Sequence, residues 1–158
     1  MGKVTDDWTP EGRRFMKELR ELSGLEVRIG YQRGTLSGRP DDSSRADLVD
    51  IAMWNEFGTV DIPSRPFMRD SVDKHEAAIN HMLTEQKDAL LHGATAREIL
   101  NTAGLFQQDL IQTEIEQGDF VANAPVTVRR KGSDKPLIDT GTMKNSVHYQ
   151  IFKKGSMD

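Results

Sequence analysis

The residues whose types and order most directly suggest chemistry are Asp139, Thr140 and Gly141. They follow two aliphatic residues in the stretch KPLIDTGTMKNS. The active-site loops of aspartic proteases have this pattern, and two such loops meet so that two close carboxylates share a proton and activate water. Because the chain has one copy of the motif, a protease built on it would have to be a dimer that contributes Asp139 from each subunit.

The amount of chain after the motif argues against a protease. Only 17 residues follow Gly141 in the 158-residue chain, too few for a substrate flap and the remaining strands. In the favoured interpretation, Asp139 or Thr140 caps the short turn GTMKNS through a side-chain oxygen, and Gly141 permits a tight bend. A dimeric aspartic protease that acts through Asp139 remains the alternative.

The other residues capable of chemistry form no recognised pattern. The histidines lack the spacing of four that places two ligands on one helix face, and Glu56 has no histidine or second acid at a fixed spacing. No G-x-G-x-x-G or G-K-[ST] phosphate loop occurs. We therefore expect neither a metal nor a cofactor. The four histidines are His75, His81, His92 and His148.

Composition sets broad limits on the class of protein. The chain has no cysteine, which excludes disulfides and thiolate catalysis, and its formal net charge is −4. A protein whose main role is to grip nucleic acid usually has a net basic surface. No apolar run is long enough for a membrane span and the first residues lack an apolar signal core, so we expect a soluble protein made in the cytoplasm.

One local cluster of basic residues departs from this acidic average. It spans a predicted turn and could contact phosphates or an acidic protein surface. The favoured interpretation is a solvated hairpin tip, and a nucleic-acid-binding accessory protein is the second alternative function. The cluster consists of Arg129, Arg130, Lys131 and Lys135.

The first part of the chain predicts a helix, a strand and a loop. Thr9 is a good N-cap, Pro10 suits the first helical position and Gly24 is a helix stop. The residues LEVRIGY, 25–31, then alternate between apolar and polar as in a strand buried on one face. Residues 32–45 have little to bury, and we expect an exposed loop that becomes ordered on a neighbouring molecule.

The central part predicts helices. A helix from about Ser44 ends at Gly58, with a broad apolar face. A long helix should run from about Arg65 to residues 92–93, and a second should begin at the capping box of Thr95 and Glu98 and end at Gly118. The two long helices should form an antiparallel hairpin or a kinked pair. The apolar face of the first helix comprises Val49, Ala52, Met53 and Phe57.

The last part predicts two more strands, in PVTVRR and in VHYQI, where apolar and polar residues alternate. The N-terminal and C-terminal strands would then share one sheet. The expected fold class is α+β: a small antiparallel or mixed sheet packed against a long helix pair, with exposed loop arms. Residues 1–158 should form a single domain, with 32–45 as its exposed loop.

Two segments of the chain resemble a family of tailed-bacteriophage structural proteins, the neck or tail-completion components. They are DIAMWNEFGTVDIPSRPFMRDSV, from Asp50 to Val72, and NAPVTVRRKGSDKPLIDTGTMKNSVHYQI, from Asn123 to Ile151. The pairing of the two segments carries the resemblance, which extends over most of the chain from Leu25 onward.

The resemblance implies a non-enzymatic virion protein of the head–tail connector. Such a subunit forms a ring, expected here to be a hexamer, that joins the portal side of the capsid to the tail. Its implied partners are other copies of itself and other neck, connector or tail proteins, with no membrane. DNA would pass through the channel without specific binding. The expected location is the virion, and the host cytoplasm during assembly.

Apolar residues around the first segment are candidates for subunit contacts, because aromatic and methionine side chains are favoured in interface cores. The alternative is that they form the core of the domain itself. Arg65 lies at a predicted helix start, where the helix dipole disfavours a cation, so a carboxylate partner is expected for it. The predicted interface residues are Trp54, Phe57, Ile62, Arg65, Phe67 and Met68.

Overall fold

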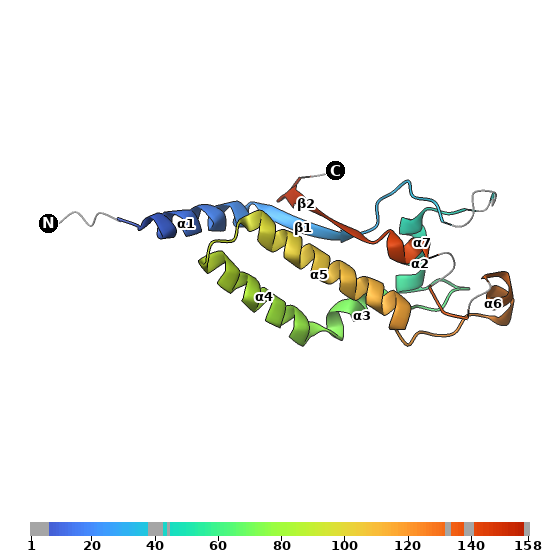
Figure 1. Cartoon of the computed structure of the whole chain (residues 1–158). Helices are drawn as coiled ribbons and strands as arrows, with labels where there is room; N and C mark the ends of the chain where they lie inside the picture. Colours follow the sequence, from blue (N-terminus) through green and yellow to red (C-terminus); the bar gives the residue numbers. More distant parts are fainter. Residues whose placement is uncertain (1–6, 38–42, 44, 132–133, 138–140, 157–158) are drawn as a thin grey trace.

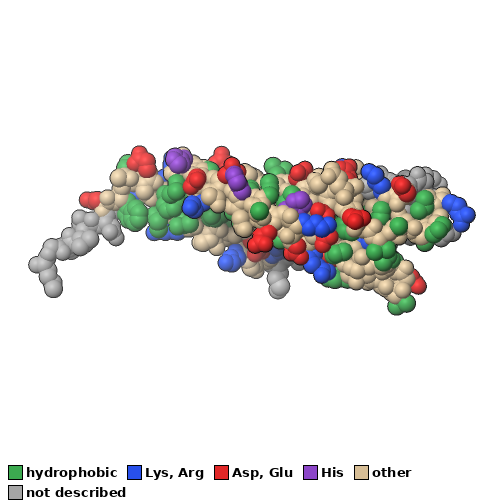
Figure 2. Space-filling model, turned by 90° about the horizontal axis from the view of Figure 1, so that it is seen from below, with side chains coloured by type: hydrophobic (Ala, Val, Ile, Leu, Met, Phe, Trp, Pro, Cys, Tyr) green, Lys and Arg blue, Asp and Glu red, His purple; other side chains and the backbone are tan. Residues whose placement is uncertain are grey.

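A computed structural model describes residues 7–37, 43, 45–131, 134–137 and 141–156. The molecule is elongated, and helix α5 (Ala96–Gln117) runs along much of its length (Figure 1). Helix α1 (Pro10–Ser23) projects at one end, and helix α2 (Leu48–Phe57) lies at the other (Figure 1). In a second view, hydrophobic side chains gather over the α1 end (Figure 2).

The sheet joins the two ends of the chain, as the sequence predicts. Strand β1 (Leu25–Gly30) pairs antiparallel with strand β2 (His148–Lys153), so that Leu25 lies opposite Lys153 and Gly30 opposite His148. Helix α5 covers one face of this two-stranded sheet (Figure 1). The predicted α+β class, with a small sheet on a long helix pair, is confirmed.

Close contact between α5 and the sheet depends on Gly104. A Cβ atom at this position would lie 2.4 Å from the Tyr149 ring, nearer than any real contact allows. The Tyr149 hydroxyl donates to the Asn101 Oδ1 atom, one helical turn earlier, at 3.2 Å. Glycine inside a helix costs about 1 kcal/mol of stability relative to alanine. Here it lets the Tyr149 ring of β2 lie directly on the helix backbone.

The ends of the long helices follow the predicted capping residues. Thr9 accepts from the Gly12 amide at 3.1 Å at the start of α1, and Gly24 ends that helix. Thr95 and Glu98 form the predicted capping box of α5, which stops at Gly118. Local capping chemistry is sufficient to define these ends, because the partners lie within three residues of each other.

The predicted long helix from Arg65 to residues 92–93 is broken. The structure has helix α3 (Phe67–Asp73) and helix α4 (Glu76–Leu91), separated by Lys74 and His75. Helix α4 runs antiparallel to α5, as the kinked-pair expectation allows (Figure 1). The break changes the direction of the chain, and both pieces contact α5.

The predicted strand in PVTVRR is wrong, because these residues form helix α6 (Pro125–Lys131). Pro125 suits a first helical position, where the missing N–H has no intrahelical partner to lose. The amides of Thr127 and Val128 donate to the Ala124 carbonyl at 2.9 and 3.1 Å. Alternating β-branched residues favour a strand only where a partner strand is available to pair with them.

The main core lies where the second half of α5 meets α2, α3 and helix α7 (Thr142–Asn145). Phe67 has no exposed surface and is its largest fully buried side chain. The bend before α7 uses Gly141, whose φ of 77° is in the left-handed region that glycine favours. Asp139 and Thr140 lie outside the described residues. The buried cluster comprises Leu48, Ala52, Phe67, Ile111, Ile115, Leu137, Met143 and Val147.

Helix α2 is rotated relative to its predicted apolar face. Its buried positions are Leu48, Ala52 and Glu56, whereas Met53 is 51% exposed and Phe57 70% exposed. The N-terminus of α2 is capped by Asp47, which accepts from the Val49 amide at 2.9 Å. The chain therefore covers only one edge of the apolar surface that the sequence places on this helix.

The ends of the predicted loop 32–45 are closer to regular structure than its composition indicates. Leu36 and Asp47 form an antiparallel bridge, and the Ser37 amide donates to the Ala46 carbonyl at 2.9 Å. Residues 38–42 and 44 lie outside the described residues, so ordering on a neighbour stays a prediction.

Two phenylalanines of α2 and α3 allow a matched test of burial. We expect Phe67→Ala to lower the free energy of unfolding by about 3–5 kcal/mol, because it leaves a cavity in the core. Phe57→Ala should change it by about 0.5 kcal/mol or less, because this side chain is mostly exposed. Urea denaturation followed by circular dichroism measures both, and equal losses would contradict the burial described here.

The capping box of α5 makes stability depend on acid. Hydrogen bonds from Thr95, chiefly from its backbone amide, hold the pKa of Glu98 below its ordinary value of 4.5. The stabilisation from the ionised carboxylate is therefore present above pH 4.5 and is lost as the pH falls through the lower pKa of the folded state. We expect Glu98→Gln to remove this part of the acid dependence. Denaturation at low salt from about pH 7 to about pH 3 tests it, and an unchanged acid slope would contradict it.

Candidate functional site

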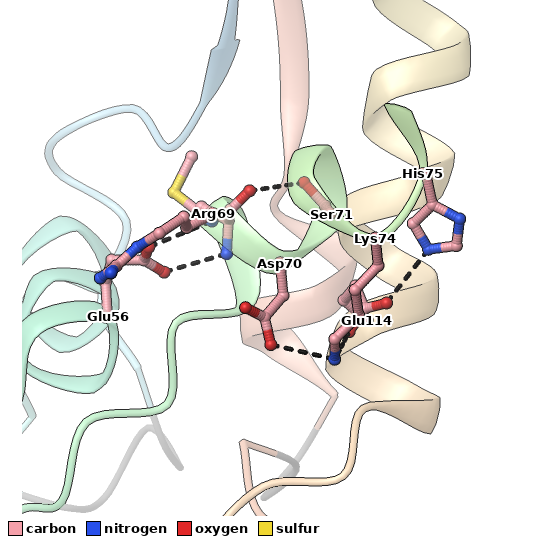
Figure 3. A network of polar contacts seen from close by, with 8 residues as sticks. Glu56, Arg69, Asp70, Ser71, Lys74, His75 and Glu114 are labelled. Atoms are coloured by element: carbon pink, nitrogen blue, oxygen red, sulfur yellow. Dashed lines mark hydrogen bonds and ion pairs between the residues drawn. The ribbon is translucent and has the colours of Figure 1, made fainter. Parts of the chain in front are cut away.

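Glu56 joins α2 to α3 through its carboxylate. Glu56 is only 7% exposed. It accepts from the backbone amides of Met68 at 2.9 Å and Arg69 at 3.1 Å (Figure 3). Helix α3 begins after Pro66, which supplies no side-chain cap, so Glu56 satisfies two of the free donors at that end.

The sequence pattern assigns no role to Glu56, although the proline before α3 is a signal that this helix needs a cap from another residue. A proline before the first helical residue cannot cap the helix with an oxygen atom, so an acceptor has to come from elsewhere. The sequence does not show which residue this is, because Glu56 and Met68 are brought together by the turn between α2 and α3.

Arg65 has its partners inside the chain, and none of those observed is the predicted carboxylate. Its guanidinium donates from Nε to the Val121 carbonyl at 2.9 Å, and from Nη1 and Nη2 to the side-chain oxygens of Asn55 and Asn123 at 3.2 Å each. A longer contact reaches the Ala122 carbonyl at 3.4 Å. These oxygens are neutral, and burial lowers the pKa of Arg65.

Arg65 lacks the predicted carboxylate partner for a physical reason. Glu56 already supplies the negative charge at the start of α3, and the Arg65 side chain turns to the segment that follows α5. Arg65 is 6% exposed. It thus ties α2 to the residues that lead into α6, and acts as a clamp within the chain.

Glu114 of α5 contacts both residues at the break between α3 and α4. Its Oε2 atom accepts from Lys74 Nζ at 3.1 Å, and its Oε1 atom lies 3.1 Å from His75 Nε2 (Figure 3). Lys74 also pairs with Asp70 at 3.0 Å, and this bond is the chief cause that raises the pKa of Lys74. Both carboxylate oxygens of Glu114 are engaged, which favours a structural role over a catalytic one.

The face of the sheet opposite α5 borders an open groove of about 950 Å³. The strand register places Arg28 opposite Gln150 and Glu26 opposite Phe152 on this outer face. The Arg28 guanidinium lies 4.6 Å from the centre of the Phe152 ring. We call this feature the groove; its lining includes Arg28, Gly30, Arg33, Val49, Met53, Phe57, Met68, His148, Gln150 and Phe152.

Helix α2 supplies one wall of the groove. Val49, Met53 and Phe57 lie at successive turns, so they share one side of the helix. This is the apolar face that the sequence predicts, and much of it is open because the interior contacts run along Leu48 and Ala52. An apolar surface with a fixed backbone beneath it is a physical basis for docking another molecule.

The six predicted interface residues separate into three sets: two are buried in the interior, two line the groove, and two do neither. Phe67 and Arg65 are buried within the chain, so they serve its interior. Phe57 and Met68 line the groove together. Trp54 is 43% exposed on α2 and does not line it, and Ile62 is partly buried in the turn that follows.

The predicted basic cluster lies at the α6 end of the molecule (Figure 1). Arg129 and Lys135 are exposed. The side chains of Arg130 and Lys131 lie outside the described part of the chain, although their backbone belongs to α6. These residues lie at a projecting end of the molecule. Their contact with phosphates or with an acidic surface stays a prediction.

Among the residues that the structure describes, no three side chains of the types His, Asp and Glu are close enough together to hold a metal ion. None of their helices combines the length and apolar character needed to span a membrane.

Comparison of the chain with protein-family models, with curated proteins and with solved structures gives no significant match. Its function therefore has to be inferred from the two sequence segments and from the geometry of the groove and the clamp.

The clamp role of Arg65 predicts a local effect on the α6 arm. Lysine carries the charge but cannot reach several separate acceptors at once. We expect Arg65→Lys to speed amide hydrogen exchange in residues 119–131 by about tenfold or more, while exchange in the middle of α5 changes little. Arg129→Lys, an exposed change in α6, is the control. Unaltered exchange in residues 119–131 would show that Arg65 does not hold this segment.

Proposed function

We propose that this chain is a non-enzymatic structural subunit of a phage head–tail connector, acting in neck or tail completion. Copies of it form a ring, proposed as a hexamer, between the portal side of the capsid and the tail. The observation that carries the proposal is the uncovered apolar wall of α2, where Phe57 is 70% exposed. Met53 and Phe57 of this wall lie inside the segment, residues 50–72, that resembles neck and tail-completion proteins.

A rigid backbone behind this wall supports an assembly role. Glu56 and Arg65 connect α2 to α3 and to the segment after α5, with bonds on both sides of the turn at residues 58–64. A surface that is already fixed loses less conformational entropy when a partner docks on it. The same turn contains Gly58, at φ 78°, whose Cβ would lie 2.9 Å from the Ser64 amide.

The charge of the chain is compatible with a channel through which DNA moves. Each cationic contact with a phosphate adds salt-sensitive affinity, which would retard sliding. With a net charge of −4, a ring of these subunits would hold DNA weakly. Three of the chain's 21 basic residues, Arg129, Arg130 and Lys131, lie together in α6. The proposed partners are neighbouring neck, connector and tail proteins. The proposed location is the virion, with assembly in the host cytoplasm.

The proposal predicts a closed oligomer of the purified chain. Sedimentation velocity over a rising concentration series should show monomers converting to one larger species of fixed mass. A chain that stays monomeric throughout would contradict the ring.

Two activity assays on the same sample separate the alternatives. We expect no peptide cleavage, and cleavage abolished by Asp139→Asn would instead indicate the dimeric protease. Binding to duplex DNA should be weak at about 0.15 M salt. Tight binding with a steep salt dependence would favour the accessory nucleic-acid-binding protein.

A further inference from the structure

Helix α1 directs two of its acidic residues toward the body of the molecule. Glu18 is 8% exposed, and its carboxylate accepts from the Ala96 amide at 2.9 Å. The carboxylate of Glu21 lies 3.7 Å from Arg97 Nε. Both contacts reach the first turn of α5, where an amide at a helix start and a guanidinium offset the negative charge. These two acids are therefore engaged within the chain.

Three basic residues occupy another side of α1. Arg13, Lys17 and Arg20 follow a spacing of four and three, which places them along one side of a helix, and all three are exposed. Glu18 lies on the other side of the helix. Among the residues that the structure describes, no carboxylate pairs with any of the three, and Arg13 donates to the neutral carbonyl of Trp8. We call these three residues the α1 stripe.

The other charged residues in and before α1 lie away from the stripe. Glu11 precedes Glu18 by two helical turns, so it lies on the same side as Glu18. Asp7 is exposed and precedes the helix. The Arg14 guanidinium lies against Gly93, where a Cβ atom would be 2.8 Å from Arg14 Nη1. The stripe is therefore a row of cations with no acid of α1 among them.

Two lysines from the far end of the chain add positive charge where α1 ends. The Lys154 amide donates to the Gly24 carbonyl at 2.8 Å, directly after the last residue of α1. Lys153 precedes it at the end of β2, and both lysines are exposed. Because these residues converge, the described residues at this end carry an excess of positive charge, although the chain has a net charge of −4.

The spacing of the stripe matches the phosphate backbone of duplex DNA. Its three residues span about 10 Å of helix, because each residue rises about 1.5 Å. The phosphates of one strand recur about every 3.4 Å along the duplex, so this length covers about three of them. Helix α1 projects from one end of the molecule (Figure 1), so a duplex can approach the stripe without meeting the bulk of the chain.

A phosphate backbone suits the stripe better than an acidic protein surface does. Protein interfaces have an apolar core, and lysine is depleted in them. On α1, Phe15 and Leu22 are half-buried on the body side, and Leu19, which is 40% exposed, lies to one side of the stripe. The stripe itself has no apolar member. Its long cationic side chains can reach phosphate oxygens, and each arginine fork can bond two of them at once.

We infer that the α1 stripe binds the phosphate backbone of duplex DNA. This site lies outside the two segments quoted for the family resemblance, and it goes beyond the proposed function because it does not depend on the ring. Phosphate contacts carry no information about base sequence, and a protein held by such contacts slides along the duplex. Three contacts per chain are weak at the salt concentration of a cell, so they permit DNA to move past the chain.

A matched pair of triple variants tests the stripe. The stripe variant carries Arg13→Gln, Lys17→Gln and Arg20→Gln. The control variant carries Arg33→Gln, Arg69→Gln and Lys87→Gln, at three exposed cations outside α1. Both variants lose the same charge, so an effect of net charge alone appears equally in the two. Glutamine has a helix propensity close to that of lysine and arginine, so circular dichroism melts of both variants should match the wild type.

Fluorescence anisotropy of a labelled DNA duplex measures the binding. At about 0.05 M salt, the wild type and the control variant should bind alike, and the stripe variant should bind at least about tenfold more weakly. Each phosphate contact contributes about 0.9 to the slope of log affinity against log salt, so the stripe variant should have a slope smaller by about 2.7. Wild-type affinity should fall at least about twentyfold from about 0.05 M to about 0.15 M salt.

Three results would overturn the inference. In the first, the wild type does not bind the duplex at about 0.05 M salt. In the second, the stripe variant and the control variant bind alike. In the third, polyglutamate of equal total charge displaces the labelled duplex as well as unlabelled duplex does, which would assign the stripe to an acidic protein partner. The connector proposal is decided separately, by the sedimentation series on the wild type.

Discussion

The fold depends on the packing of a two-stranded sheet against a single long helix. Two strands are too few to be stable by themselves in water, so β1 and β2 need the face that α5 provides. Gly104 makes the contact possible by letting the Tyr149 ring lie on the helix backbone. Because α5 has 22 residues, the elements attached along it are spread out in a row. The consequence is an elongated molecule whose two ends are only partly covered by its own chain.

Buried carboxylates hold the spread elements in place. Glu18 binds the start of α5 to α1, and Glu56 binds the start of α3 to α2. Glu114 binds Lys74 and His75 where α3 gives way to α4. In each case the carboxylate accepts from backbone amides or from cations of another element, which offsets the cost of its burial. Directional bonds of this kind fix orientations in a molecule that has a small core, and they leave apolar groups available on the outside.

Much of the fold could be predicted from the sequence, because many signals are local. The capping box of Thr95 and Glu98 and the glycine stop at Gly118 concern residues close together in the chain. The break at Lys74 could not be foreseen from local signals, and the contact that Lys74 makes there is with Glu114, 40 residues away. The helix at Pro125 could not be predicted, because an alternating pattern forms a strand only where a partner strand is available to pair with it.

The candidate site was predicted by residue type more than by residue position. The apolar face of α2 was recognised, but Phe57 and Phe67 are the same amino acid on either side of one turn. Only the three-dimensional packing decides that Phe67 is enclosed and that Phe57 faces outward. The central claim, that the open apolar wall of α2 is a contact surface of a closed oligomer, can be measured at Phe57, which is 70% exposed. The wild-type chain should form one larger species of fixed mass in sedimentation velocity, whereas Phe57→Asp should stay monomeric with an unchanged thermal melt. Assembly of Phe57→Asp at the same concentrations as the wild type would contradict it.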